Sequence, residues 1–188
     1  MKAIALFLAL LVMSCCTAKL QAQWVQTSGP YSNAIQALAV NGTNLFAGTY
    51  GGVYRSTDNG TNWTPVNIGL TKIDFQAFAV IGSNLFVGTS PCGSMLSGGV
   101  FLSTNNGTSW TEVSTGLPSS KVQAFVVSGT NLFASNLDGG VFLSTNNGTN
   151  WTSVSPRLPH TYVNALSVQG TNLYAGTNNG VLLSTITV

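Results

Sequence analysis

Charged side chains are scarce in this sequence. Of the 188 residues, six are Lys or Arg and four are Asp or Glu, which amounts to 5% of the chain, whereas about a quarter of an average domain is charged. So few basic residues cannot form the cationic stripe that neutralises phosphates, so a nucleic-acid partner is excluded. The low charge also argues against a chain kept unfolded by self-repulsion. We expect a folded domain.

Cysteine and histidine are almost as rare, with three and one in the chain. Two of the cysteines, Cys15 and Cys16, lie near the N-terminus, and once that segment is removed Cys92 has no partner for an intrachain disulfide. Cys92 and His160 are too few to hold zinc. We therefore expect no metal and no cofactor, and stability that comes from packing and hydrogen bonds.

The N-terminal segment has the pattern of a signal peptide. Lys2 precedes an unbroken apolar run, Ala3–Met13, which is too short to span a bilayer as a helix. Cleavage after Ala22 would remove residues 1–22 as a signal peptide. Alternatively, residues 12–15 act as a degenerate lipobox and Cys15 carries a lipid anchor. Both alternatives predict a secreted or extracytoplasmic protein with no transmembrane segment after signal removal.

The rest of the chain is an internal repeat. The segment Gly-Thr-Asn-Leu-Phe-Ala-Gly-Thr at residues 42–49 recurs with small changes from Gly82, Gly129 and Gly170, a spacing of roughly 40 residues. Each repeat reads as four short strands separated by turns such as Asn59-Gly60, the dipeptide typical of tight hairpins. Four antiparallel strands in such a unit match one blade of a β-propeller.

The repeats predict an all-β propeller with about four four-stranded blades in a domain at residues 23–188. The blades are expected near residues 33–66, 74–113, 122–154 and 163–185. The last repeat lacks its fourth strand, and residues 24–27 resemble residues 63–66. We expect this N-terminal strand to complete the last blade and close the ring, which would remove an exposed edge. The alternative is a truncated fragment of a longer propeller.

A motif in the third hairpin carries a family resemblance. Residues 56–63 fit the pattern S-x-D-x-G-x-x-W, and residues 103–110 and 144–151 fit it with Asn in place of Asp. The chain therefore resembles the Asp-box (BNR) repeat propellers, which include sialidases, sortilin-type receptors and photosystem-assembly-factor-like proteins. The resemblance implies that the box is a structural turn lying away from the binding face. The box residues are Ser56, Asp58, Gly60, Trp63, Ser103, Asn105, Gly107, Trp110, Ser144, Asn146, Gly148 and Trp151.

The supply of charged residues argues against catalysis. A sialidase-like site needs an arginine cluster, and only Arg55 and Arg157 are present. A glycosidase needs two carboxylates flanking one bond, and among the four acidic residues only Asp74 and Asp138 are expected to share a face. We therefore expect a non-catalytic member of the family, with an Asp-box carbohydrate hydrolase as the alternative.

The loops on one face vary between repeats, whereas those on the other face repeat. Variable loops on a rigid scaffold are the usual place for recognition, so we expect a binding or scaffolding module for an unidentified protein or glycan. The alternative is that these loops are merely solvated. The candidate ligand-binding residues are Tyr31, Tyr50, Lys72, Asp74, Met95, Leu96, Lys121, Asp138, Arg157, His160 and Tyr162.

Overall fold

The computed structural model describes residues 23–31, 34–72, 74–91, 98–118, 121–137, 140–155, 158 and 162–186. In these residues the chain forms fifteen β-strands and no helix, and hence no helix able to cross a membrane. The predicted signal peptide and the alternative lipid anchor at Cys15 lie outside the described residues. Their processing remains a prediction.

The strands form four antiparallel sheets, each a meander in chain order. Sheet 1 contains β1 (Ile35–Asn41), β2 (Asn44–Thr49), β3 (Gly52–Ser56) and β4 (Thr64–Pro65). Sheet 2 contains β5 (Asp74–Ile81), β6 (Asn84–Ser90), β7 (Gly99–Ser103) and β8 (Thr111–Glu112). Sheet 3 contains β9 (Val122–Ser128), β10 (Asn131–Asn136), β11 (Val141–Ser144) and β12 (Thr152–Ser153). Sheet 4 contains β13 (Val163–Gln169), β14 (Asn172–Thr177) and β15 (Gly180–Thr185).

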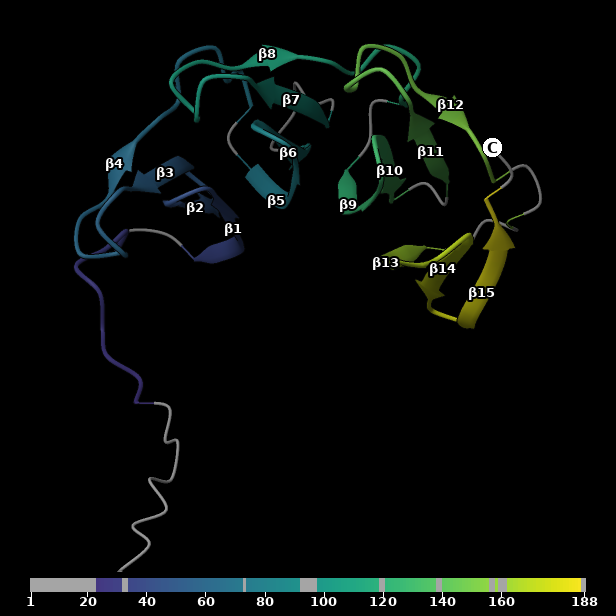
Figure 1. Ribbon diagram of the computed structural model, residues 1–188, viewed down its shortest axis with the longest axis horizontal. Helices are drawn as coiled ribbons and strands as arrows, with labels where there is room; N and C mark the ends of the chain where they lie inside the picture. Colours follow the sequence, from purple (N-terminus) through teal and green to yellow (C-terminus); the bar gives the residue numbers. More distant parts are fainter. Residues whose placement is uncertain are drawn as a thin grey trace, which may run out of the picture.

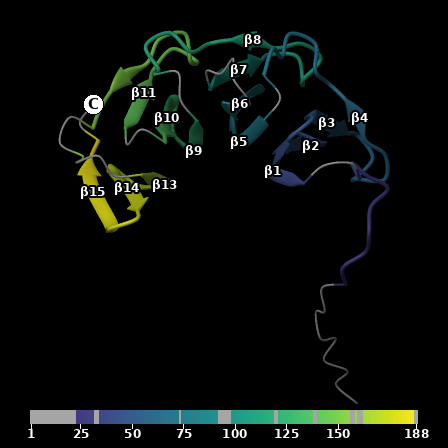
Figure 2. The same cartoon turned by 180° about the vertical axis from the view of Figure 1, so that it is seen from behind.

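The four sheets stand side by side around an open arch (Figure 1). The first strand of each sheet lies on the inner side of the arch, and the short strands β4, β8 and β12 lie on its outer side. The same arrangement is visible from behind in Figure 2. The inner strands also contact one another in chain order, β1 with β5, β5 with β9 and β9 with β13. The predicted all-β fold with four antiparallel sheets is thus confirmed.

The core lies between neighbouring sheets. Phe46 and Val53 of sheet 1 pack with Phe75 and Leu85 of sheet 2, and all four side chains are fully buried. Similar clusters join sheet 2 to sheet 3 and sheet 3 to sheet 4. Each buried side chain of this size contributes about 1.5–3 kcal/mol, so the contacts between sheets make a large contribution to stability.

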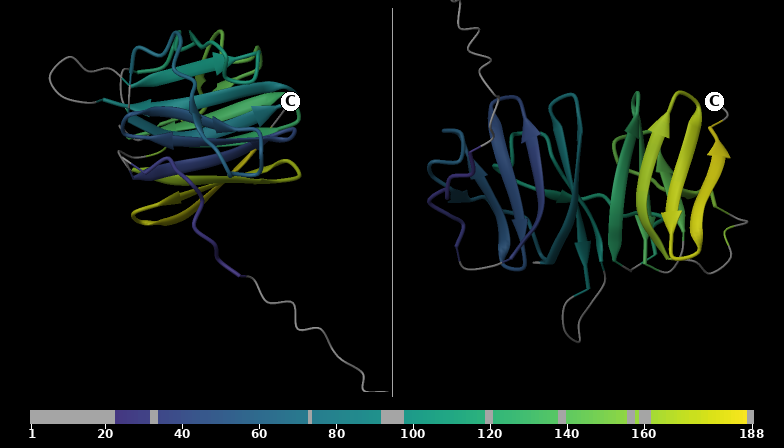
Figure 3. Two further views of the ribbon diagram at one scale, coloured as in Figure 1. Left: turned by 90° about the vertical axis from the view of Figure 1, so that its left-hand side faces the viewer. Right: turned by 90° about the horizontal axis from the view of Figure 1, so that it is seen from below.

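The predicted closure of the ring by the N-terminal strand is wrong for a single chain. Sheet 4 has three strands, and in the described part of the chain β15 pairs only with β14. Trp24 is 95% exposed, and its segment leaves the arch at the end opposite β15 (Figure 3). The physical reason lies at the inner strands, where bulky side chains such as Phe75 and Phe78 stand between the sheets. Because these side chains fill the space between the inner strands, neighbouring sheets cannot approach more closely there.

Candidate binding face

Strand direction divides the loops between two faces. We call the end at which β1, β5, β9 and β13 begin the loop face, and the opposite end, with the β1–β2 turns and the Asp-box hairpins, the turn face. Six predicted site residues lie in or beside the loop face, namely Tyr31, Tyr50, Lys72, Asp74, Lys121 and Tyr162. The others, Met95, Leu96, Asp138, Arg157 and His160, lie outside the described residues.

Lys72 is engaged within sheet 2. Its Nζ lies 2.6 Å from Oε1 of Glu112 and donates a 3.2 Å hydrogen bond to the Gly98 carbonyl. The same ammonium lies 5.5 Å from the centre of the Phe101 ring, a cation–π distance. Lys72 thus contacts the outer part of sheet 2 from the link between β4 and β5, and its charge is paired with that of Glu112.

Asp74 and Lys121 of the loop face also form hydrogen bonds, Asp74 through its side chain and Lys121 through its backbone. The carboxylate of Asp74 accepts a hydrogen bond from Nε2 of Gln76. The backbone carbonyl of Lys121 accepts a 2.9 Å bond from the N–H of Leu137. The two carboxylates expected to share a face cannot be compared, because Asp138 lies outside the described residues. Nor do the described residues contain a cluster of three or more His, Cys, Asp or Glu that could hold a metal.

Tyrosine rings supply the accessible surface of the loop face. Tyr31, Tyr50 and Tyr162 are 71%, 49% and 51% exposed. The Tyr31 hydroxyl donates a 2.6 Å bond to the Thr27 carbonyl, which orients its ring. Tyr50 lies in the β2–β3 turn of sheet 1, and Tyr162 immediately precedes β13 of sheet 4. An exposed tyrosine offers a flat apolar ring together with a polar hydroxyl, a combination that suits recognition.

The Asp-box hairpin satisfies its carboxylate internally. Oδ1 of Asp58 accepts 2.8 Å bonds from the Ser56 hydroxyl and the Asn62 N–H, while Oδ2 accepts a 2.7 Å bond from Nδ2 of Asn62. These bonds stabilise the ionised form, so the backbone N–H and side chain of Asn62, followed by Ser56, lower the pKa of Asp58 below its ordinary value. The turn itself passes through Asn59 and Gly60 with φ of 56° and 85°, which these two residue types tolerate best.

The other two boxes form the same turn with an amide in place of the carboxylate. Ser103 donates to Asn105 at 2.9 Å, and Ser144 donates to Asn146 at 3.0 Å. A neutral side chain therefore suffices for the turn, because one side-chain oxygen is enough to accept the hydrogen bond from the serine hydroxyl. In the first box, both carboxylate oxygens of Asp58 accept hydrogen bonds from within the hairpin.

Two of the Asp-box tryptophans form hydrogen bonds to the preceding sheet. Nε1 of Trp110 donates a 2.8 Å bond to the Val66 carbonyl of the preceding sheet, and Nε1 of Trp151 donates a 2.8 Å bond to the Val113 carbonyl. Both indoles are 4% exposed. Trp63 of sheet 1 is only half-buried and donates instead to Gly60 of its own hairpin, at 3.1 Å.

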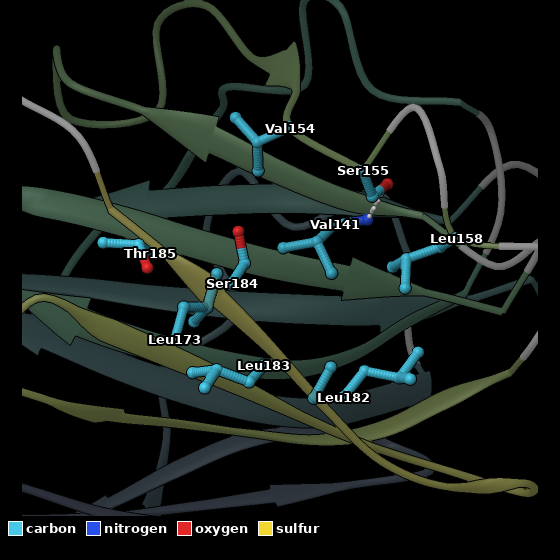
Figure 4. A pocket seen from close by; sticks show the side chains of 10 residues that line it. Val141, Val154, Ser155, Leu158, Leu173, Leu182, Leu183, Ser184 and Thr185 are labelled. Carbon is cyan, nitrogen blue, oxygen red and sulfur yellow. Dashed lines mark hydrogen bonds between the residues drawn. The ribbon is translucent and has the colours of Figure 1, made fainter.

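Sequence reasoning missed an apolar pocket between sheets 3 and 4. It has a volume of about 600 Å³ and lies between the two sheets, as Figure 4 shows. Sheet 3 and the link after it contribute Val141, Val154, Ser155 and Leu158, and sheet 4 contributes Leu173, Ala175, Leu182, Leu183, Ser184 and Thr185. The signal that could have revealed it is the fourth repeat, which has no tryptophan of its own in the sequence.

Solved structures that resemble this chain have propeller-type folds. The extracellular domain of the one-component system BT4673 from B. thetaiotaomicron is 16% identical with a TM-score of 0.69, covering 85% of this chain and 22% of that one. The GH74 xyloglucanase from Xanthomonas campestris is 16% identical with a TM-score of 0.65, covering 81% and 29%. The computationally designed protein Ika4 is 15% identical with a TM-score of 0.67, covering 89% of this chain and 100% of Ika4.

These similarities establish the β-propeller fold. The chain spans under a third of the first two proteins, so their whole-protein activities do not transfer to it. No protein-family model and no curated protein matches the sequence.

Proposed function

We propose that the protein is an extracytoplasmic binding or scaffolding module that presents its loop face to a protein or glycan. The observation that carries the proposal is the set of exposed tyrosines, Tyr31, Tyr50 and Tyr162, on a scaffold of rigid sheets. A tyrosine side chain has only two χ angles and so loses little conformational freedom on binding, and the ring of Tyr31 is also held by its bond to the Thr27 carbonyl. The propeller-type extracellular domain of BT4673 supports the compartment, and the signal-peptide pattern of residues 1–22 is consistent with it.

The proposal includes the absence of catalysis. It is supported by the occupation of the described carboxylates, since Asp58 is hydrogen-bonded within its hairpin and Glu112 is paired with Lys72. Asp74 accepts from Gln76. A hydrolase needs two carboxylates placed on either side of one glycosidic bond, and these three serve separate local structures.

Binding is tested by screening the purified protein against a glycan array and, separately, against extracellular protein extracts with mass-spectrometric identification. Tyr50→Ala and Tyr162→Ala should each weaken a genuine loop-face ligand by about tenfold or more, as an aromatic contact at an interface does. Tyr50→Phe separates ring stacking from hydroxyl bonding. Thr108→Ala, on the exposed turn face, is the matched control and should leave binding unchanged.

Two results would overturn the proposal. If Thr108→Ala abolished binding while the tyrosine variants did not, the loop face would be the wrong surface. If the protein released reducing sugar from a bound glycan, the module would be an enzyme. The compartment is tested separately by the N-terminus of the secreted protein, expected at Gln23, with lipidated Cys15 as the alternative.

A further inference from the structure

Neighbouring sheets pack through the same pair of surfaces at each interface of the arch. Sheet 1 at one end leaves one of these surfaces exposed, and sheet 4 at the other end leaves the other exposed. The strand register gives equivalent positions at the start of the first strand of each sheet, occupied by Ile35, Phe75, Val122 and Val163. The last three are buried to 1% exposure or less, whereas Ile35 is 42% exposed. Leu38, equivalent to the packed Phe78, is 70% exposed. In sheets 2, 3 and 4, the side chains at these positions pack against the preceding sheet. In sheet 1, the equivalent side chains are exposed to solvent.

Sheet 4 presents the matching acceptor. In sheet 1, an added Cβ at Gly48 would lie 3.1 Å from both Phe75 and Phe78 of the next sheet, so the missing side chain makes room for these rings. Gly176 occupies the same register position in sheet 4, and the contacts within 4 Å of its added Cβ come from Ala165 of its own sheet.

The valine paired with this glycine is also covered in sheet 1 and exposed in sheet 4. Val53, paired with Gly48, is fully buried, whereas Val181, paired with Gly176, is 72% exposed. The free face of sheet 4 thus has the shape that the free face of sheet 1 fits.

The N-terminal segment lies where the outer strand of a preceding sheet would lie. A methyl of Val66, just after β4, is 3.3 Å from the added Cβ of Gly107 in the next hairpin, and a methyl of Thr27 is 3.4 Å from that of Gly60. Thr27 thus contacts the Asp-box hairpin of sheet 1 in the same way as Val66 contacts the Asp-box hairpin of sheet 2. Figure 1 shows the segment running along the outer side of the arch and away from sheet 1. In the part of the chain that the structure describes, residues 23–27 pair with no strand and sheet 4 has three strands.

The pocket between sheets 3 and 4 is lined by residues equivalent to those that surround Trp110. Trp110 is packed with Val53, Val66 and Phe101 in the core between sheets 1 and 2. The residues equivalent to those three at the next-but-one interface are Val141, Val154 and Leu182, and all three line the pocket in Figure 4. Trp24 is the tryptophan of the N-terminal segment that is equivalent to a box tryptophan. It lies three residues before Thr27, as Trp63 lies three residues before Val66. The Trp24 side chain is 95% exposed.

We propose that two copies of this chain join head to tail into one closed ring and exchange their N-terminal segments. Residues 25–26 of each copy pair with β15 of the other as its fourth strand. Trp24 fills the pocket between sheets 3 and 4 of the other copy, with Nε1 donating to the Val154 carbonyl. Ile35 and Leu38 then pack over Gly176 of the other copy. A single chain cannot make these contacts, because its N-terminal segment lies beside the Gly60 hairpin of sheet 1, whereas the pocket is lined by sheets 3 and 4. Sheets 1 and 4 form the two ends of the arch (Figure 1).

A second copy fits these surfaces better than an unrelated partner does. One chain carries both complementary faces, and a head-to-tail contact closes when the arcs complete a circle. Strands β1 and β15 carry no charged side chain, so no like charges oppose the contact. Closure also covers the free edge of β15, which would otherwise template aggregation. The assembly is independent of any ligand on the loop face.

The test is the molar mass of the full-length secreted protein, by light scattering and sedimentation over a wide concentration range. We expect a dimer. Trp24→Ala should weaken it by at least about a hundredfold, since two buried anchors are lost per ring, and Trp24→Phe should weaken it less. Gly176→Val, which blocks the acceptor, should also yield monomer. Thr111→Val, on the exposed outer strand β8, is the matched control and should remain dimeric.

Trp24 lies in an exposed segment, so its replacement leaves the arch folded even if Gly176→Val does not, as circular dichroism would show. Trp24 fluorescence should shift to shorter wavelength on dimerisation. A monomer at about 100 µM would overturn the proposal, and so would a dimer unaffected by Trp24→Ala. A mass above two copies would overturn the two-copy ring.

Discussion

Removal of a single indole, that of Trp110, should test whether contacts between sheets dominate the stability. The Trp110 side chain is 4% exposed and lies in the core between sheets 1 and 2. Truncation of a buried aromatic residue to Ala costs about 3–5 kcal/mol. The Val66 carbonyl also loses its indole donor, and an unsatisfied buried acceptor costs about 1–3 kcal/mol. Trp110→Ala should therefore lower the free energy of unfolding by at least about 4 kcal/mol.

Two variants divide this loss into its parts. Trp110→Phe keeps an aromatic ring but removes the donor to the Val66 carbonyl, so it should cost about 1–3 kcal/mol. Trp63→Ala removes a half-buried indole whose Nε1 bonds within its own hairpin, and should cost less than Trp110→Ala. In the monomeric Trp24→Ala background, Trp63 thus serves as the matched control, since it has the same place in its repeat but no sheet packed against its outward side.

Urea unfolding followed by far-UV circular dichroism measures these differences, because it does not depend on the tryptophans that are replaced. The transitions need checking for two-state behaviour, since repeat arrays can unfold in parts. Equal costs for Trp63→Ala and Trp110→Ala would refute the reasoning, since the hairpins rather than the packing between sheets would then hold the arch together.

The local fold was predictable because its signals are local. Asn59-Gly60 and its counterparts mark hairpin turns whatever the rest of the chain does, and the repeated Leu-Phe segments mark the second strand of each sheet. The angle between sheets carries no such signal. It depends on how Phe75 and Phe78 stand against Gly48, a contact between repeats, and so the sequence supported a closed ring that one chain does not form.

The candidate site was predictable only in position. The alternation of strands places Tyr50, Lys72 and Lys121 near one end of the sheets. The ion pair between Lys72 and Glu112 joins residues that are 40 apart in sequence, and no pattern in the sequence predicts it. The pocket between sheets 3 and 4 is hidden for a related reason. The residues that the repeats share do not indicate it, and its signal is the tryptophan that the fourth repeat lacks in the sequence.

Three further perturbations follow from single contacts. Gly48→Val should lower the free energy of unfolding by about 1–3 kcal/mol, because the new side chain would overlap Phe75 and overpacking carries that cost; an unchanged urea midpoint would show that the sheets can part freely. Lys72→Met should cost about 1 kcal/mol or less, since its partner Glu112 is 44% exposed and such ion pairs are weak; a much larger loss would mean that the ammonium anchors the link between β4 and β5. Asp58 should make the first hairpin sensitive to acid. Its pKa in the folded protein is lowered by bonds from Asn62 and Ser56, so the stabilisation is fully present above the ordinary pKa of an aspartate, near 4, and is lost as pH falls through the lower folded pKa. Asp58→Asn copies the two other boxes, so the difference in unfolding midpoint between wild type and variant should be constant at neutral pH and shift against wild type below about pH 4. A difference that stays constant down to pH 2 would show that the carboxylate is no better bonded in the folded hairpin than in the unfolded chain.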